Sequence, residues 1–246
     1  DFDLQVPGMP RSVLQSLADR GIAAYAVDLR GYGETPRDAT GYLTPDRAAA
    51  DVEAVLRWVA TRHPALPKPA LLGWSNGAFV AHYVAQRSAP LLSSVTLFGY
   101  TPGVEEPYGP GVLPPPAIAP KVKNTREAAV SDFIAPDVTP PAVVKAFAEQ
   151  ALAADPVYAE WKIDRYMTLT AASLRAPVLV IHGEKDPGAD VATAAEFLAA
   201  VSTGDKRYVV LPGADHCAQL EDTHDAFVAA VADFVTATRR ARRSSW

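Results

Sequence analysis

Cysteine is nearly absent from this 246-residue sequence, which contains Cys217 and no other. A single thiol excludes an intrachain disulfide and a metal cluster held by thiolates. We assign Cys217 no chemistry, because a free cysteine commonly packs as a small hydrophobic side chain. Cysteine usage leaves the compartment open, and we favour a cytoplasmic protein.

Long apolar runs and an excess of positive charge are also missing. Although 49% of the residues are hydrophobic, no apolar run reaches the roughly 18 residues needed to span a bilayer, so we expect no membrane span. The formal net charge of −5 offers no electrostatic footprint for nucleic acid or an anionic membrane. We interpret the four arginines within 239–246 as a solvated basic tail.

Short β-rich runs alternate with amphipathic helical patterns along most of the chain. Candidate strands lie at 23–29, 70–74, 94–98, 177–182 and 207–211. Apolar residues at helical spacing predict a crossover helix around 52–59 and a long closing helix around 227–235. This alternation predicts the α/β class, with a mostly parallel sheet covered by helices on both faces.

The alternation breaks between residues 101 and 175. Seven prolines fall within 102–120, and proline cannot join a central strand. Helix-start signals at 139–141 then precede an alanine-rich helix. Since a plain connection is much shorter, we expect a helical cap or lid at 101–175 between two core parts, 1–100 and 176–238, with the basic tail at 239–246.

Ser75 lies in the pentapeptide Gly73-Trp74-Ser75-Asn76-Gly77, between a predicted strand and a predicted helix. The pattern G-x-S-x-G in that context is typical of a nucleophile elbow. A sharp strand-to-helix turn holds the serine hydroxyl out into a site, and glycine neighbours let the strand and the helix approach closely. The backbone amide of Asn76 can donate to a developing oxyanion. We therefore predict a nucleophile and half of an oxyanion hole here.

A serine nucleophile needs a histidine base that is oriented by a carboxylate. Of the five histidines, His216 fits best, because it lies in a loop just beyond the last candidate strand. Asp186 follows the strand at 177–182, at the carboxyl end of the sheet, where ligands bind in open α/β sheets. We expect His182 to serve packing or hydrogen bonding. The fallback acids are Glu184, Asp190 and Asp215.

With Ser75, Asp186 and His216 in this order, the chain resembles the α/β-hydrolase fold serine hydrolases from about residue 7 to 235. The segment 28–35 (Asp-Leu-Arg-Gly-Tyr-Gly-Glu-Thr) looks like the family's loop after an early strand. The resemblance implies an acyl-enzyme on Ser75, with His216 first as base and then as acid. It also implies a small-molecule, ester-like substrate, water as the second substrate, and no metal or organic cofactor. The oligomeric state is left open.

The N-terminal part departs from this family. Family members usually carry a His-Gly stretch after an earlier strand, and its loop gives the second oxyanion donor. The first strands and this donor have no counterpart here, and the sequence begins with Asp1 and has no charged-then-apolar leader. We therefore expect a processed or incomplete N-terminus. Losing one donor typically costs about 100- to 1000-fold in turnover.

Aromatic residues in or beside the predicted cap can line an acyl pocket or pack the cap on the core. The candidates for substrate contacts are Trp74, Tyr100, Trp161 and Tyr166. We interpret Arg30, Gly31 and Gly33 as residues that shape and anchor a turn.

Several activities are compatible with these residues. The leading hypothesis is hydrolysis of a carboxylic ester. The same three side chains also serve thioester or lactone hydrolysis, acyl transfer and hydrolysis of a carbon-carbon bond. Because fold does not fix function, a non-catalytic ligand-binding or sensor protein is the alternative from another class, and the missing second donor supports it.

Overall fold

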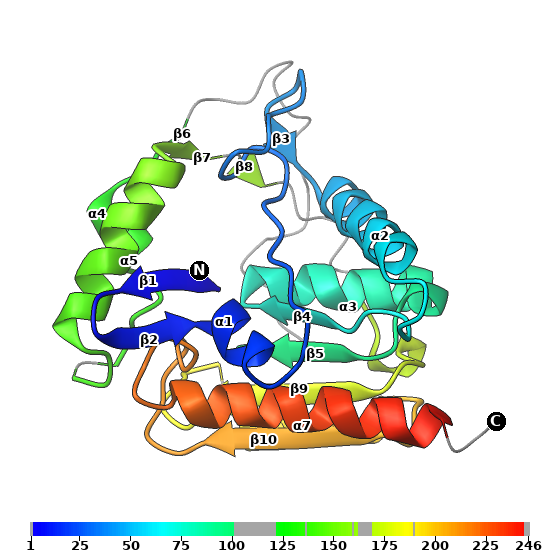
Figure 1. The fold of residues 1–246 in the computed structure, drawn as a ribbon. Coiled ribbons are helices and arrows are strands. Elements are labelled where there is room, and N and C mark those ends of the chain that lie inside the picture. Colours follow the sequence, from blue (N-terminus) through cyan, green and yellow to red (C-terminus); the bar gives the residue numbers. More distant parts are fainter. Residues whose placement is uncertain are drawn as a thin grey trace.

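A four-stranded parallel sheet forms the centre of the computed structural model, which describes residues 2–100, 122–135, 137–158, 160–161, 169–188 and 190–243 (Figure 1). The strands are β4 (Leu71–Trp74), β5 (Val95–Phe98), β9 (Val178–Gly183) and β10 (Lys206–Leu211), in the order β10-β9-β5-β4. All three neighbouring pairs are parallel. These strands confirm four of the five expected from the sequence, with small shifts at their ends.

Helices cover both faces of this sheet. One face carries α2 (Pro45–Arg62), α3 (Asn76–Ser88) and α6 (Val191–Ala200), and the other carries α1 (Val13–Ala18) and α7 (His224–Arg243). Alternate residues of β9 serve the two faces, since Val178 and Val180 join one core cluster and Leu179 and Ile181 join the other. The apolar run that predicted a buried strand therefore fills two cores at once. The expected α/β class is confirmed.

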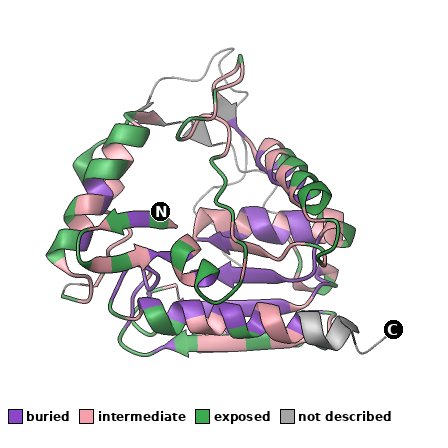
Figure 2. Ribbon diagram, viewed as in Figure 1, coloured by how far each residue is buried: buried purple, intermediate pink, exposed green. Residues whose placement is uncertain are grey.

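The prediction of a strand at 23–29 was wrong. This segment is extended but belongs to no strand, and Figure 2 shows that it is largely exposed, whereas β5 and β9 are buried. The physical reason is the lack of a neighbour, because a strand exists only where another backbone completes its hydrogen bonds. The segment does not pair with β4, which is the edge strand of the sheet.

The N-terminal residues form a separate hairpin. β1 (Asp3–Val6) pairs antiparallel with β2 (Met9–Ser12), and the Ser12 hydroxyl caps α1 by accepting from the Gln15 amide at 3.0 Å. Within the described residues, no strand that precedes β4 in the chain joins the central sheet.

The predicted cap is described in part, and its boundaries stay a prediction. The elements are β6 (Val122–Lys123), α4 (Arg126–Ala129), α5 (Pro141–Ala154), β7 (Val157–Tyr158) and β8 (Glu160–Trp161). β6 pairs with β7, and β8 pairs with β3 (Tyr42–Leu43). Val143 and Phe147 of α5 pack with Leu4 of β1, so this helix contacts the N-terminal hairpin. The proline-rich stretch lies outside the described residues. Among the described helices, none has the length and hydropathy of a membrane span.

Candidate functional site

Ser75 occupies a strained turn between β4 and α3. Its φ of 52° and ψ of −123° place a non-glycine residue at positive φ, which is uncommon and persists only where the surroundings fix it. The Ser75 amide donates to the Phe98 carbonyl of β5 at 2.9 Å, and the Ser75 carbonyl accepts from the Ala78 amide at 2.8 Å. Asn76 is the first residue of α3. The structure thus has the strand, the sharp turn and the helix that the pentapeptide predicts.

Gly73 is the glycine that this turn requires. A Cβ at Gly73 would lie 2.1 Å from the Gly77 carbonyl oxygen, which is a backbone atom and cannot move aside. A Cβ at Gly77 would meet nothing within 4 Å. The close approach of strand and helix therefore depends on the first glycine of the motif and not on the second.

Asp186 and His216 are hydrogen-bonded to each other. Asp186 follows β9 and His216 follows the adjacent β10, so both side chains lie at the carboxyl end of the sheet. The His216 Nδ1 and Asp186 Oδ2 atoms are 2.8 Å apart, and the Gly188 amide donates to Asp186 Oδ1 at 2.8 Å. The loops that end two neighbouring strands bring together residues that are 30 positions apart.

The two side chains shift each other's pKa in opposite directions. Burial favours the neutral form of Asp186, but the nearby His182 imidazole, 3.8 Å away, and the hydrogen bond and charge of His216 outweigh it and hold the pKa of the carboxyl well below its usual range. Burial lowers the pKa of His216, but the hydrogen bond and the negative charge of Asp186 outweigh it and raise the pKa of this imidazole. The pair is therefore arranged to stabilise an imidazolium.

The fallback acids have other partners. Glu184 accepts from the Gly213 amide, Asp190 caps α6, and Asp215 accepts from the amides of Ala135 and Cys217. In the described part of the chain, Asp186 is the carboxylate hydrogen-bonded to His216. This geometry favours Asp186 over the three alternatives.

His216 lies over the ends of β4 and β5. The Trp74 indole N–H donates to the His216 carbonyl oxygen at 2.8 Å, and the two ring centroids are 5.6 Å apart. Since Ser75 directly follows Trp74, the nucleophile candidate is next in the chain to a residue that contacts His216. No hydrogen bond joins Ser75 to the His216 ring among the described residues. Such catalytic hydrogen bonds are often long without substrate.

Two residues around His216 were not singled out as site residues from the sequence. Gly99, directly after β5, has a φ of +57°, and a Cβ there would lie 2.7 Å from His216 Cε1. His182 is 1% exposed, and its Nδ1 lies 3.8 Å from Asp186 Oδ2. Two sequence signals could have identified them. Gly99 directly follows a predicted buried strand, and His182 precedes the candidate acid Asp186 by four residues.

The candidates for substrate contacts are spread over different parts of the fold. Trp74 is buried and stacks on Phe98. Tyr100 is buried in the core, where its hydroxyl lies 2.7 Å from His82 Nδ1. Trp161 lies in β8, and Tyr166 lies outside the described residues. Their role as substrate contacts stays a prediction.

The loop after residue 28 has structural contacts that fit its interpretation as a shaped turn. Arg30 pairs with Asp51 and Asp38 at 2.5 and 3.2 Å. Gly31 and Gly33 have positive φ, and a Cβ at Gly33 would lie 2.2 Å from Asp28 Oδ2. These contacts anchor the loop to α2. They explain the presence of Arg30, Gly31 and Gly33 by the structure of the loop itself, without a role in ligand binding.

Cys217 is fully buried, and its thiol donates to the Asp132 carbonyl oxygen at 3.1 Å. Burial raises the pKa of this thiol. A thiol that stays protonated is a poor nucleophile, in line with our interpretation of Cys217 as a packing residue. In the part of the chain that the structure describes, no three His, Cys, Asp or Glu side chains are grouped to hold a metal ion.

Replacing Gly99 with alanine should misplace His216. The new Cβ would lie 2.7 Å from Cε1 and 2.9 Å from Nδ1 of the imidazole, at a backbone φ that disfavours alanine. We expect a loss of about 100-fold in kcat, since small displacements of catalytic groups have effects of this size. Gly204→Ala is the matched control, because its Cβ meets nothing within 4 Å. Wild-type turnover in the Gly99 variant would contradict this steric account.

The Glu221 carboxyl should make stability depend on pH. Glu221 is 1% exposed, and its oxygens lie 3.2 and 3.1 Å from the Asp215 amide. Burial, followed by the hydrogen bond and charge of Asp215, raises the pKa of Glu221 to about 9. An unfolded glutamate has a pKa of about 4.3. Between about pH 4.3 and pH 9, the folded state therefore binds a proton at Glu221 that the unfolded state does not bind. The contribution of this group is fully present below about pH 4.3 and is lost as the pH rises toward 9.

Glu221→Gln should remove this dependence, because glutamine does not titrate. We expect the Tm of the variant to exceed that of the wild type increasingly as the pH is raised from 5 to 9, measured by thermal denaturation. Glu196→Gln, on the exposed side of α6, serves as the control. A Tm difference between wild type and the Glu221 variant that stays constant across this pH range would show that Glu221 ionises with an ordinary pKa.

Comparison with known proteins assigns a family. The family model described as serine aminopeptidase, S33 matches residues 8–223. The monoacylglycerol lipase of Mycolicibacterium smegmatis is 27% identical over 231 residues, which cover 85% of this chain and 76% of that protein.

Solved structures show the same fold. A thermophilic esterase from Thermogutta terrifontis has a TM-score of 0.62 at 17% identity, covering 94% of this chain and 88% of that one. The monoacylglycerol lipase of Paleococcus ferrophilus has a TM-score of 0.59 at 17% identity, covering 92% and 88% of the two chains. Because the family model covers most of the sequence and these neighbours share the fold, the chain belongs to the serine aminopeptidase S33 family of α/β-hydrolases.

Proposed function

We propose that this protein is a serine hydrolase that cleaves a carboxylic ester through an acyl-enzyme on Ser75. The observation that carries the proposal is the strained serine at the end of β4, beside an imidazole that is hydrogen-bonded to a buried carboxylate. Membership of a hydrolase family and the likeness to proteins named as monoacylglycerol lipases and esterases support an ester substrate.

The roles follow from the geometry. His216 Nδ1 faces Asp186, so Nε2 is the ring nitrogen left to take the Ser75 proton as the hydroxyl attacks the ester carbonyl. The Asn76 amide at the start of α3 is one donor to the oxyanion. His216 then gives its proton to the leaving alcohol, and water releases the acid in a second cycle of the same kind. The partners are thus a small-molecule ester and water.

Other acyl substrates use the same steps. A thioester, a lactone or an alcohol acceptor changes the leaving or attacking group but not the roles of Ser75 and His216. We favour the ester because the relatives' names refer to ester hydrolysis. Among the proposed substrate contacts (Trp74, Tyr100, Trp161 and Tyr166), Trp74 is next to Ser75 in the chain, and the cap at 101–175 is the proposed cover of the site.

A panel of nitrophenyl esters, a thioester and a lactone, combined with fluorophosphonate labelling, tests this function. We expect turnover of the esters and a phosphonyl adduct on the peptide that carries Ser75, identified by mass spectrometry. A protein that gains thermal stability with an ester-like ligand, yet shows neither turnover nor an adduct, would be a binding protein and not an enzyme.

A further inference from the structure

The loop that carries His216 joins β10 to α7 and is held by hydrogen bonds from other parts of the fold. The Lys185 amide donates to the Ala214 carbonyl oxygen at 2.7 Å and ties the loop to the segment after β9. The Ala135 amide donates to Asp215 Oδ2 at 2.8 Å and ties it to the segment after α4. Neither segment carries the candidate nucleophile, so neither contact links the imidazole directly to the serine.

Trp74 links the same loop to β4. Its indole N–H donates to the His216 carbonyl oxygen at 2.8 Å, and no backbone amide of the described residues donates to that oxygen. Trp74 directly precedes Ser75. This hydrogen bond therefore joins the backbone of His216 to the chain neighbour of the residue with which His216 exchanges a proton in the proposed reaction.

Packing holds the indole in place. Trp74 is 8% exposed, and its ring is stacked on the fully buried Phe98, with the centroids 6.2 Å apart. Phe98 in turn packs on Phe227 of α7, with the centroids 4.7 Å apart. Because the indole is already ordered by these contacts, its hydrogen bond to the loop costs little additional side-chain entropy.

Gly99 allows the indole and the imidazole to meet. A Cβ at Gly99 would lie 3.4 Å from Trp74 Cδ1 and 2.7 Å from His216 Cε1, so both rings lie against the same backbone position. Three contacts thus fix His216, since Asp186 binds Nδ1, Gly99 packs at Cε1, and Trp74 binds the carbonyl oxygen. None of them involves Nε2, the ring nitrogen that takes the proton in the proposed reaction.

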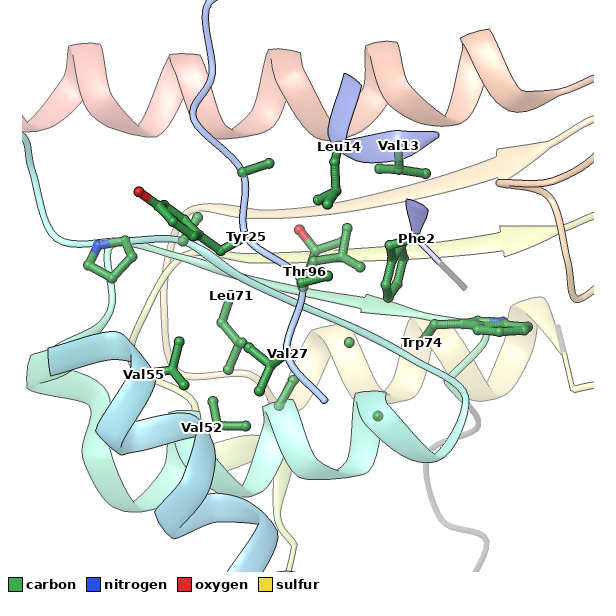
Figure 3. Close-up of a pocket in the computed structure, with 18 of the residues that line it drawn as sticks. Phe2, Val13, Leu14, Tyr25, Val27, Val52, Val55, Leu71, Trp74 and Thr96 are labelled. Carbon is green, nitrogen blue, oxygen red and sulfur yellow. The ribbon is translucent and has the colours of Figure 1, made fainter. Parts of the chain in front are cut away.

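Trp74 also lines a pocket that includes Ser75, and Figure 3 shows its indole among the side chains around this space. Two roles of Trp74 can therefore be distinguished by the atoms that they use. A substrate contact uses the aromatic ring, whereas the contact with His216 uses the N–H. Loss of a contact that is equal in the ground state and the transition state raises KM, and loss of one that matters only in the transition state lowers kcat.

We propose that Trp74 is a positioning residue for the ester hydrolysis proposed above, and that its indole N–H, through the His216 carbonyl oxygen, holds the imidazole in place relative to Ser75. The kinetic part of this role rests on the proposed function. Asp186 orients the ring at Nδ1, whereas Trp74 fixes the peptide unit from which the ring projects. A displacement of about 1 Å at a catalytic group can cost about 100-fold in rate, so one hydrogen bond at this point has a large effect.

Two substitutions in the 246-residue chain separate the N–H from the ring. Trp74→Phe keeps an aromatic ring that stacks on Phe98 but has no donor. Trp74→His keeps a donor, because Nε2 of a histidine is as many bonds from the backbone as the indole Nε1, but it loses the six-membered ring. We expect Trp74→Phe to lower kcat by about 10- to 100-fold with KM changed by less than about twofold, and Trp74→His to keep kcat within about threefold of the wild type.

Hydrogen exchange measures the positioning without a substrate. The amides of Asp215 and Cys217 flank His216, and both donate to carboxyl oxygens of the same loop. In the Trp74→Phe variant the loop loses its hydrogen bond to β4, so we expect these amides to exchange at least about tenfold faster than in the wild type. The Trp74→His variant should exchange at the wild-type rate.

Trp58→Phe is the matched control, because Trp58 lies on α2 and is 51% exposed. It should leave kcat, KM and the exchange of the loop amides unchanged. Circular dichroism checks that all three variants fold.

Three kinetic results would overturn the proposal. A Trp74→Phe variant with wild-type kcat would show that the N–H does not position His216. An equal loss of kcat in both Trp74 variants would show that the bulk of the indole matters and its N–H does not. A raised KM at unchanged kcat would show a substrate contact alone.

A wild-type protein that hydrolyses no ester would refute the proposed function but would still leave the exchange rates to decide the role of Trp74. Faster exchange of the loop amides in Trp74→Phe, restored in Trp74→His, would support a hydrogen bond that holds the His216 loop. Unchanged exchange in Trp74→Phe would overturn it.

Discussion

Ser75→Ala is expected to abolish turnover of nitrophenyl esters and labelling by a fluorophosphonate. Alanine keeps the backbone but removes the oxygen that forms the acyl-enzyme. Loss of the nucleophile in serine hydrolases lowers kcat by about 10⁶-fold, which would leave only background hydrolysis. The measurement is a paired assay of ester turnover and of the phosphonyl adduct by intact mass.

Stability separates a chemical effect of this substitution from a structural one. Ser75 already has a φ of 52°, and alanine has the same Cβ, so the strain and the Tm should change little. Ser202→Ala, on an exposed loop after α6, is the control and should keep full activity and labelling. Retained labelling of the Ser75 variant would show that another residue is the nucleophile.

The sequence predicted those elements whose signal is local. The apolar run of β9 is buried at every position, and the glycine-serine pentapeptide encodes its own turn, since Gly73 has no space for a Cβ. The positions of Asp186 and His216 were predicted because each follows a strand, and parallel strands that are neighbours bring their carboxyl-end loops together.

The features that the sequence alone did not determine depend on distant neighbours. Residues 23–29 have the composition of a strand, but composition does not supply the backbone that a strand pairs with. Gly99 matters because the His216 ring lies against it, and no pattern around Gly99 reveals a contact with a residue so far along the chain. Tyr100 beside the predicted cap is equally compatible with a pocket or with the core, where its hydroxyl meets His82.

Asp186→Asn is expected to lower kcat by about 10⁴-fold, as for the loss of the orienting carboxylate in other serine hydrolases, and also to move the pH profile. His216 acts as a base in its neutral form, so kcat/KM falls as the pH drops through the pKa of this imidazole. Asp186 raises that pKa, and the wild-type acid limb should therefore have its midpoint above the ordinary histidine value of about 6.5. Asparagine carries no charge to stabilise the imidazolium, so the midpoint of the residual activity should shift to lower pH. Asp190→Asn, which alters only the exposed cap of α6, should keep both the rate and the midpoint. An Asp186 variant that loses rate without any shift would show that the carboxylate orients the ring but does not set its protonation.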